Sequence, residues 1–170
     1  MKKSFKLALA GLFSALALIS FVLENLFPPL ILPGAKMGIS NLFILLSAIL
    51  LGGWYAYTVL IVKTVLGSLF VGNISMIMYS LPAGALALGL ELILIYFVKT
   101  VSILATSIAG AVINSTVQNI VFCLVTTIPE HLFYLPYLAL LSVISGALIG
   151  FATHFSIKIF PKRLLLRGNE

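Results

Sequence analysis

The chain has 170 residues and a formal net charge of +6; 62% of its residues are hydrophobic and only 8% are charged. Soluble domains carry roughly one-quarter charged residues, so this composition excludes an ordinary soluble protein and predicts an integral membrane protein. The basic residues follow a membrane-orientation pattern rather than forming a nucleic-acid-binding patch, so nucleic acid is not an expected partner.

The apolar segments predict a single all-α domain, residues 1–170, with six transmembrane helices. A bilayer crossing needs about 17–25 apolar residues, and Gly, Pro and charged residues divide the chain into stretches of comparable length. The predicted spans are 5–26, 37–51, 55–71, 74–98, 101–128 and 132–160. The basic start of the first span is also typical of a signal peptide. Its apolar run continues to Leu23, beyond the roughly 7–15 residues of a signal core, so we expect a retained helix.

The basic residues predict how the spans are oriented. Six crossings place both termini on one side, and eight of the ten Lys and Arg residues fall on that side: Lys2, Lys3, Lys6, Lys99, Lys158, Lys162, Arg163 and Arg167. Lys36 lies in a connection on the opposite side, and Lys63 lies within a span. Because cytoplasmic loops carry an excess of Lys and Arg, we expect a multi-pass protein of the cell membrane with both termini in the cytoplasm.

Small residues recur at four-residue spacing on the first predicted helix, where Ala10 pairs with Ser14 and Gly11 with Ala15. Such stripes let helix backbones approach closely in lipid. They predict either internal packing within the bundle or docking on a partner membrane protein.

Polar residues gather in the half of the predicted bundle that faces away from the termini. Lys63 lies near the midplane, where an ammonium costs roughly 2.5–3.5 kcal/mol and therefore usually faces a protein interior or an aqueous cavity. The same half contains Lys36, Asn41, Tyr79, Asn114 and Gln118. These residues predict an outward-facing substrate-binding site. Lysines with amides suit a small anionic ligand such as a phosphate or a carboxylate.

The same residues also have structural interpretations. The amides can form hydrogen bonds between helices, which applies to Asn114, Gln118 and Asn119. His131 can be an interfacial residue. Glu91 could pair with Lys63, but a rise of 1.5 Å per residue places Glu91 roughly 12 Å deeper. We therefore expect Glu91 to serve the cytoplasmic half, through a coupling contact or in a protonated form.

Several catalytic motifs are absent from the sequence. There is no Asp, so the Asp-rich magnesium motif of prenyl diphosphate synthases cannot form. Lys63 and Thr64 lack the preceding Gly of a phosphate-binding loop. Neither an HExxH motif nor paired Cys residues provide a zinc site. We therefore expect no catalytic residue, metal or cofactor in this chain, and any ATP would be used by partner subunits.

Three segments carry a family resemblance: 33–41 (PGAKMGISN), 63–72 (KTVLGSLFVG) and 110–118 (GAVINSTVQ). They are similar to the Gx transporter family, often labelled heptaprenyl diphosphate synthase component I. The resemblance implies a fold like the substrate-binding S components of energy-coupling factor (ECF) transporters. In that architecture six helices bind a vitamin or precursor near the outer face, the first helix contacts a coupling subunit, and ATPases belong to other chains. Where Arg and His are expected, this chain has Lys63 and Ile113.

The leading hypothesis is therefore an S component of an ECF-type uptake transporter for a small, anionic nutrient or an isoprenoid- or quinone-related precursor. Its expected partners are membrane lipid, a coupling subunit and ATPases. The alternative is a membrane accessory component of heptaprenyl diphosphate or quinone synthesis, or of an extracytoplasmic flavin or electron-transfer system. None of these roles requires the chain to be an enzyme.

Overall fold

A computed structural model describes residues 3–26, 38–98 and 100–159, and every regular element in these ranges is a helix. The elements, in chain order, are α1 (Lys3–Leu26), α2 (Ile39–Leu50), α3 (Gly53–Phe70), α4 (Ser75–Phe97), α5 (Ile103–Thr126), the short 3-10 helix η1 (Pro129–Tyr134) and α6 (Leu135–Ile159). The predicted all-helical fold is confirmed, and no helix boundary differs from the predicted one by more than three residues.

Five helices are long and apolar enough to cross a membrane, namely α1, α3, α4, α5 and the continuous segment of η1 and α6. Helix α2 has only 12 residues. At 1.5 Å per residue it is about 18 Å long, whereas the hydrocarbon core of a bilayer is about 30 Å thick. The predicted crossing of residues 37–51 is therefore not made by α2 alone, and the count of six crossings stays a prediction.

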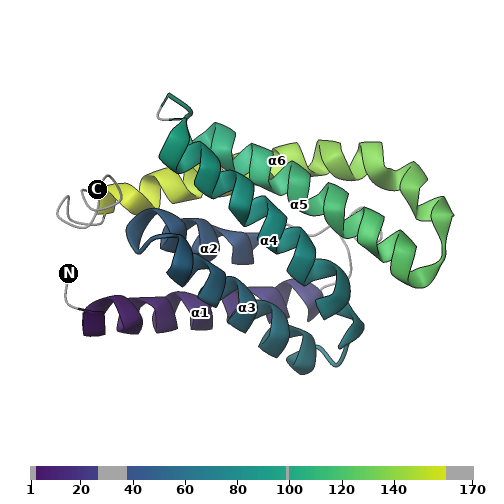
Figure 1. The fold of residues 1–170 in the computed structure, drawn as a ribbon, viewed down its shortest axis with the longest axis horizontal. Helices are drawn as coiled ribbons and strands as arrows, with labels where there is room; N and C mark the ends of the chain where they lie inside the picture. The colour runs from purple at the N-terminus through teal and green to yellow at the C-terminus, as the bar shows by residue number, and fades with distance from the viewer. Residues whose placement is uncertain (1–2, 27–37, 99, 160–170) are drawn as a thin grey trace.

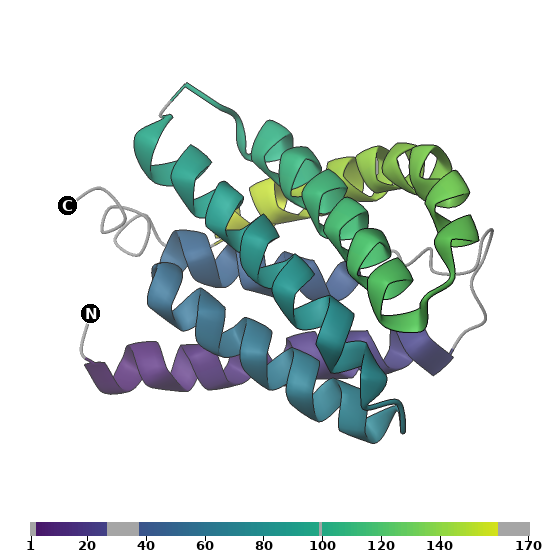
Figure 2. The same cartoon turned by 45° about the vertical axis from the view of Figure 1, so that its right-hand side comes forward.

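The helices run alternately in opposite directions, so α1 begins and α6 ends at the same end of the bundle (Figures 1 and 2). We call this the terminal end, and we call the opposite end, where α1 ends and α4 begins, the cavity end. Helices α1, α2 and α3 pack against one another, while α4 packs on α3 and α5, and α5 packs on α6. Helix α2 lies at the centre of the bundle, in contact with α1, α3, α4 and α6.

The sequence of α2 accounts for its central position. It is apolar apart from Ser40, Asn41 and Ser47 and carries no Asp, Glu, Lys or Arg, and a helix with so little polar surface is buried. Its C-terminal half joins the main hydrophobic core, which lies toward the terminal end and includes Phe13 of α1, Leu50 of α2 and Val59 of α3. The opposite half of the bundle is consequently less tightly filled with apolar side chains.

Large apolar side chains cover the outside of the bundle. Trp54, Phe97, Phe133 and Ile159 are each 80% exposed or more. Soluble proteins rarely expose contiguous apolar patches of large size. The exposed apolar surface and the long apolar helices together identify a multi-pass membrane protein.

Candidate functional site

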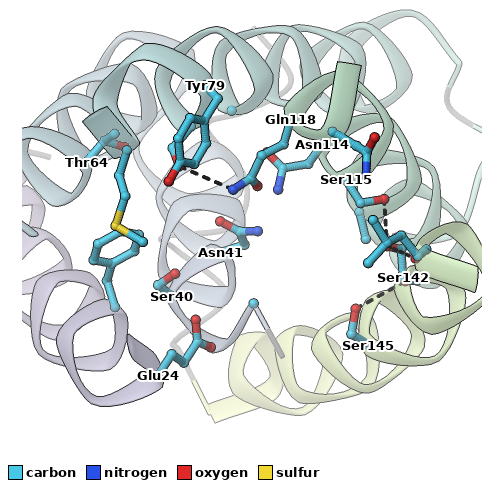
Figure 3. Close-up of a pocket in the computed structure, with 18 of the residues that line it drawn as sticks. Glu24, Ser40, Asn41, Thr64, Tyr79, Asn114, Ser115, Gln118, Ser142 and Ser145 are labelled. Carbon is cyan, nitrogen blue, oxygen red and sulfur yellow. Dashed lines mark hydrogen bonds between the residues drawn. The ribbon is translucent and has the colours of Figure 1, made fainter. Parts of the chain in front are cut away.

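The cavity end contains a cavity of about 360 Å³, into which seven elements contribute side chains (Figure 3). The polar lining residues are Glu24, Ser40, Asn41, Lys63, Thr64, Tyr79, Ser80, Asn114, Ser115, Gln118, Asn119, His131, Ser142 and Ser145. Apolar residues complete the walls, among them Phe21, Leu60, Met76, Phe122 and Ile149. The cavity thus brings hydrogen-bonding groups from all six α-helices and from η1 into the interior of an apolar bundle.

Lys63 is the buried cation of this cavity. Its side chain is only 6% exposed, and its Nζ donates a hydrogen bond of 2.7 Å to Oδ1 of Asn41. The same ammonium lies 5.7 Å from the ring centroid of Phe21, within the range of a cation–π interaction. An ammonium has three N–H donors, so it can donate to more than one acceptor at a time.

The start of α2 presents Asn41 to the cavity. Gly38 precedes the helix with φ of 71°, a left-handed conformation that glycine adopts without steric cost. The amide of Ile39 donates to Oε1 of Glu24 at the end of α1. This contact places a carboxylate at the N-terminus of α2, where the helix dipole favours negative charge. Glu24 therefore fixes the helix turn that carries Ser40 and Asn41.

Two buried hydroxyl groups lie beside Lys63 and Asn41. Ser40 is 2% exposed and Thr64 is fully buried, and both line the cavity. Within the described residues, Oγ1 of Thr64 has no hydrogen-bond partner. Burying a hydroxyl group without a hydrogen-bond partner lowers the free energy of unfolding by about 1–3 kcal/mol. Its position against the cavity makes Thr64 a candidate donor to a bound ligand.

Amide side chains of α5 form a further part of the wall. Nε2 of Gln118 donates to Oγ of Ser80 over 3.4 Å, which links α5 to α4. Asn114 lies one turn from Gln118 and points to the same side, as Figure 3 shows. Asn119 is buried and accepts a weak hydrogen bond from Cys123, so its contact within α5 differs from the predicted bond between helices.

Serine hydroxyl groups of α5 and α6 form another wall, on the far side of the cavity from Thr64 and Tyr79 (Figure 3). Oγ of Ser142 lies 2.6 Å from Oγ of Ser115, and Ser145 donates to the backbone oxygen of Ser142 over 3.2 Å. Each hydroxyl can both donate and accept. This wall therefore suits a neutral polar group, whereas the wall with Lys63 suits an anion.

A line of aromatic rings borders the cavity near the end of α5. Tyr79 packs edge-on against Phe122 with centroids 5.5 Å apart, and Phe122 packs against His131 at 4.9 Å. His131 also contacts Tyr134, at 5.8 Å. The short helix η1 is held to α4 and α5 through these rings. His131 consequently lines the cavity, which the interfacial interpretation of this residue did not include.

The structure brings together five of the six predicted binding residues: Asn41, Lys63, Tyr79, Asn114 and Gln118. The sixth, Lys36, lies outside the described residues. The sequence interpretation did not include Glu24 or the hydroxyl groups of Thr64, Ser115, Ser142 and Ser145 in the site, although all of them line the cavity. Glu91 lines a second, smaller cavity instead. The two cavities share lining residues, among them Asn41 and Asn114, and the predicted difference in depth between Glu91 and Lys63 stays a prediction.

The small residues of α1 divide between two faces. Ala10 is 3% exposed, and Ser14 is buried with its hydroxyl donating to the backbone oxygen of Ala10. These two residues pack inside the bundle. Gly11 and Ala15 are exposed, and a Cβ added at Gly11 would meet nothing within 4 Å. Docking on a partner thus stays a prediction, and the surface left for it consists of Gly11 and Ala15.

Comparison with known protein families gives a match over residues 13–156 to the sequence model of a family described as heptaprenyl diphosphate synthase component I. The match extends from α1 to α6 and confirms the family label that the three sequence segments suggested. No curated protein and no solved structure matches the chain significantly. The likeness to ECF S components stays a prediction.

Proposed function

This chain belongs to the heptaprenyl diphosphate synthase component I family, and we propose that it is the membrane-embedded substrate-binding component of an ECF-type uptake transporter for a small anionic compound. A coupling subunit and ATPases on other chains would supply the energy. In this role the protein captures its ligand in the large cavity and contributes no catalytic residue of its own.

The observation that carries this proposal is the buried ammonium of Lys63 at the wall of a cavity of about 360 Å³. A charge inside a membrane bundle is costly, and such residues mark substrate or ion pathways. Lys63, Thr64 and Ser40 offer N–H and O–H donors at one place, which suits a carboxylate or phosphate group. Ligand pockets measure about 300–1,000 Å³, so this cavity fits a compound at the small end of the range.

The distribution of charge supports an outward-facing cavity. Lys3, Lys6 and Lys158 lie at the terminal end, whereas the connections between α3 and α4 and between α5 and α6 contain no Lys or Arg. Lys36 is the one basic residue that the sequence analysis assigns to a connection on the opposite side. Under the positive-inside rule the terminal end faces the cytoplasm. The cavity then faces the outside, as an uptake component requires, and six crossings place both termini in the cytoplasm.

The test is mass spectrometry of small molecules that copurify with the protein in lipid nanodiscs. We expect an anionic compound with the wild type, and we expect Lys63→Met to retain at most one-tenth as much. Lys3→Met, at an exposed position of α1, serves as the control and should retain the wild-type amount. Equal retention by Lys63→Met and the wild type would rule out Lys63 as the ligand-binding cation.

The alternative function is a membrane accessory component of heptaprenyl diphosphate or quinone synthesis, and the description of the family favours it. Copurification distinguishes the two functions. An uptake component should bring down transporter ATPases and a coupling subunit, whereas an accessory component should bring down a prenyl diphosphate synthase subunit.

A further inference from the structure

The three serines on the wall formed by α5 and α6 use all their hydroxyl hydrogens within the protein. Ser142 donates to the backbone oxygen of Leu138 over 2.6 Å, and Ser145 donates to that of Ser142 over 3.2 Å. Ser115 donates to the backbone oxygen of Val112 over 3.1 Å. A further contact of 2.6 Å joins the hydroxyl oxygens of Ser115 and Ser142. Because a serine hydroxyl has one hydrogen, these contacts leave none for a ligand.

This serine wall therefore offers acceptors to the cavity. A hydroxyl oxygen has two acceptor lone pairs, and within the wall only the contact between Ser115 and Ser142 uses one of them. All three serines line the large cavity, and Figure 3 shows them on one side of it. A ligand group with an O–H or N–H donor is consequently bound best at this wall, whereas a carbonyl or carboxylate oxygen would face other oxygen lone pairs.

The opposite side of the cavity offers donors. The hydroxyl of Thr64 is fully buried and has no hydrogen-bond partner among the described residues, and the ammonium of Lys63 precedes it on α3. Glu24 is the other charged residue of the described lining, and its carboxylate accepts from the amide of Ile39. One cation and one carboxylate in the same lining favour a ligand with a single negative charge, because a second one would be poorly matched at low dielectric constant.

Aromatic side chains line the same cavity. Phe21, Tyr79 and Phe122 are among its lining residues, and Met76 adds a thioether. Aromatic rings and thioethers pack favourably against another ring. A flat, unsaturated body therefore suits the apolar part of the lining.

We propose that the ligand of the large cavity is an aromatic monocarboxylate that carries a hydroxyl group at the end opposite its carboxylate. The carboxylate accepts hydrogen bonds from Lys63 and Thr64, and the hydroxyl donates to the serine wall at Ser115 and Ser142. The choice of an anion rests on the proposed function. The preference for a donor at the other end rests only on the hydrogen bonds of the three serines.

The test measures equilibrium binding of matched probes to the purified protein in nanodiscs. Para-hydroxybenzoate is compared with para-fluorobenzoate, and the longer para-hydroxycinnamate with para-fluorocinnamate. Fluorine is close to a hydroxyl in size but cannot donate, and the two lengths sample different spans between the walls. In the pair that binds more tightly, we expect the hydroxy acid to bind about fivefold to tenfold more tightly than its fluoro analogue. Equal binding within both pairs would overturn the proposal.

Variants of the serine wall locate the hydroxyl group. Ser115→Ala and Ser142→Ala should each reduce the preference for the hydroxy acid to about twofold or less, and thermal unfolding shows whether each variant is folded. Ser75→Ala, at an exposed position of α4, is the matched control and should keep the full preference. A full preference in both wall variants would mean that the hydroxyl binds elsewhere and would also overturn the proposal.

Two further probes separate this inference from the proposed function. Para-hydroxybenzyl alcohol keeps the ring and the hydroxyl but has no charge. If it binds more weakly than para-hydroxybenzoate, and Lys63→Met removes this difference, anion capture at Lys63 is supported whatever the fluoro analogues show. Equal binding of the alcohol and the acid would contradict an anionic ligand. Tighter binding of para-hydroxyphenyl phosphate than of para-hydroxybenzoate would overturn the single negative charge but not anion capture.

Discussion

The ammonium of Lys63 and the side-chain oxygen of Asn41 lie 2.7 Å apart, and their hydrogen bond joins the middle of α3 to the first turn of α2. Asn41→Leu removes the acceptor and leaves the ammonium in place. Because a hydrogen bond to a charged group contributes about 1.5–3 kcal/mol, we expect the free energy of unfolding to fall by about that amount. Denaturant titration in mixed micelles measures this change.

Asn73→Leu is the control for this prediction, because Asn73 lies in the exposed turn between α3 and α4. Its effect should stay within about 0.5 kcal/mol. If both variants lose the same stability, the bond between Lys63 and Asn41 does not stabilise the bundle.

Two glycines of different surroundings give a second prediction. Gly110→Ala places a methyl group where the Glu91 carboxylate lies, so we expect a loss of about 1–3 kcal/mol from overpacking. Gly11→Ala meets open space and should stabilise α1 by up to about 1 kcal/mol, since Ala is the better helix former. Thermal unfolding compares the two. If Gly110→Ala stabilised the protein, this would contradict the observed position of the Glu91 carboxylate against Gly110.

The accessibility of the cavity can be measured with cysteines on α6. In a background that carries Cys123→Ala, Ser145→Cys lines the cavity and should react with a membrane-impermeant thiol reagent added outside intact cells. Thr153→Cys replaces a fully buried residue near the terminal end and should stay unlabelled. Labelling of Ser145→Cys only after the cells are permeabilised would reverse the proposed orientation.

The division of small residues on α1 predicts two different mutant phenotypes. Gly11→Leu and Ala15→Leu add bulk to an exposed surface, so the isolated protein should keep its unfolding temperature while copurification with the proposed coupling subunit decreases. Ala10→Leu adds bulk at a site that is 3% exposed, and overpacking there should cost about 1–3 kcal/mol. Unchanged copurification of the Gly11 and Ala15 variants would exclude this surface as the docking site.

The helices could be predicted closely because apolar runs and their Gly, Pro and charged breaks specify them directly. The central position of α2 in the bundle could not be predicted from the sequence. A run of 15 predicted residues is compatible with a short span or with a core helix, and only the contacts of α2 with α1, α3, α4 and α6 decide between them. Long-range packing of this kind has no periodic signature in the sequence.

The site was predictable where a residue type is unusual inside a membrane span, as with Lys63, Asn114 and Gln118. Hydroxyl residues carry no such signal, because Ser and Thr in helices often bond to the backbone four residues earlier. Ser14 and Thr58 do so, through the oxygens of Ala10 and Trp54. Thr64 looks the same in sequence, yet its hydroxyl faces the cavity side without a partner among the described residues.

The packed core and the cavity occupy opposite ends of one bundle, and this separation has a dynamic consequence. Regions with few packed apolar contacts open locally at lower free energy than a dense core does. In the proposed uptake role, a ligand would enter and leave by local rearrangement around η1 and the adjoining ends of α4 and α5, while the core that contains Phe13, Leu50 and Val59 keeps the helices assembled. The terminal end, which holds the packed core, is thus the more rigid part of the bundle, and the cavity end is the more deformable part.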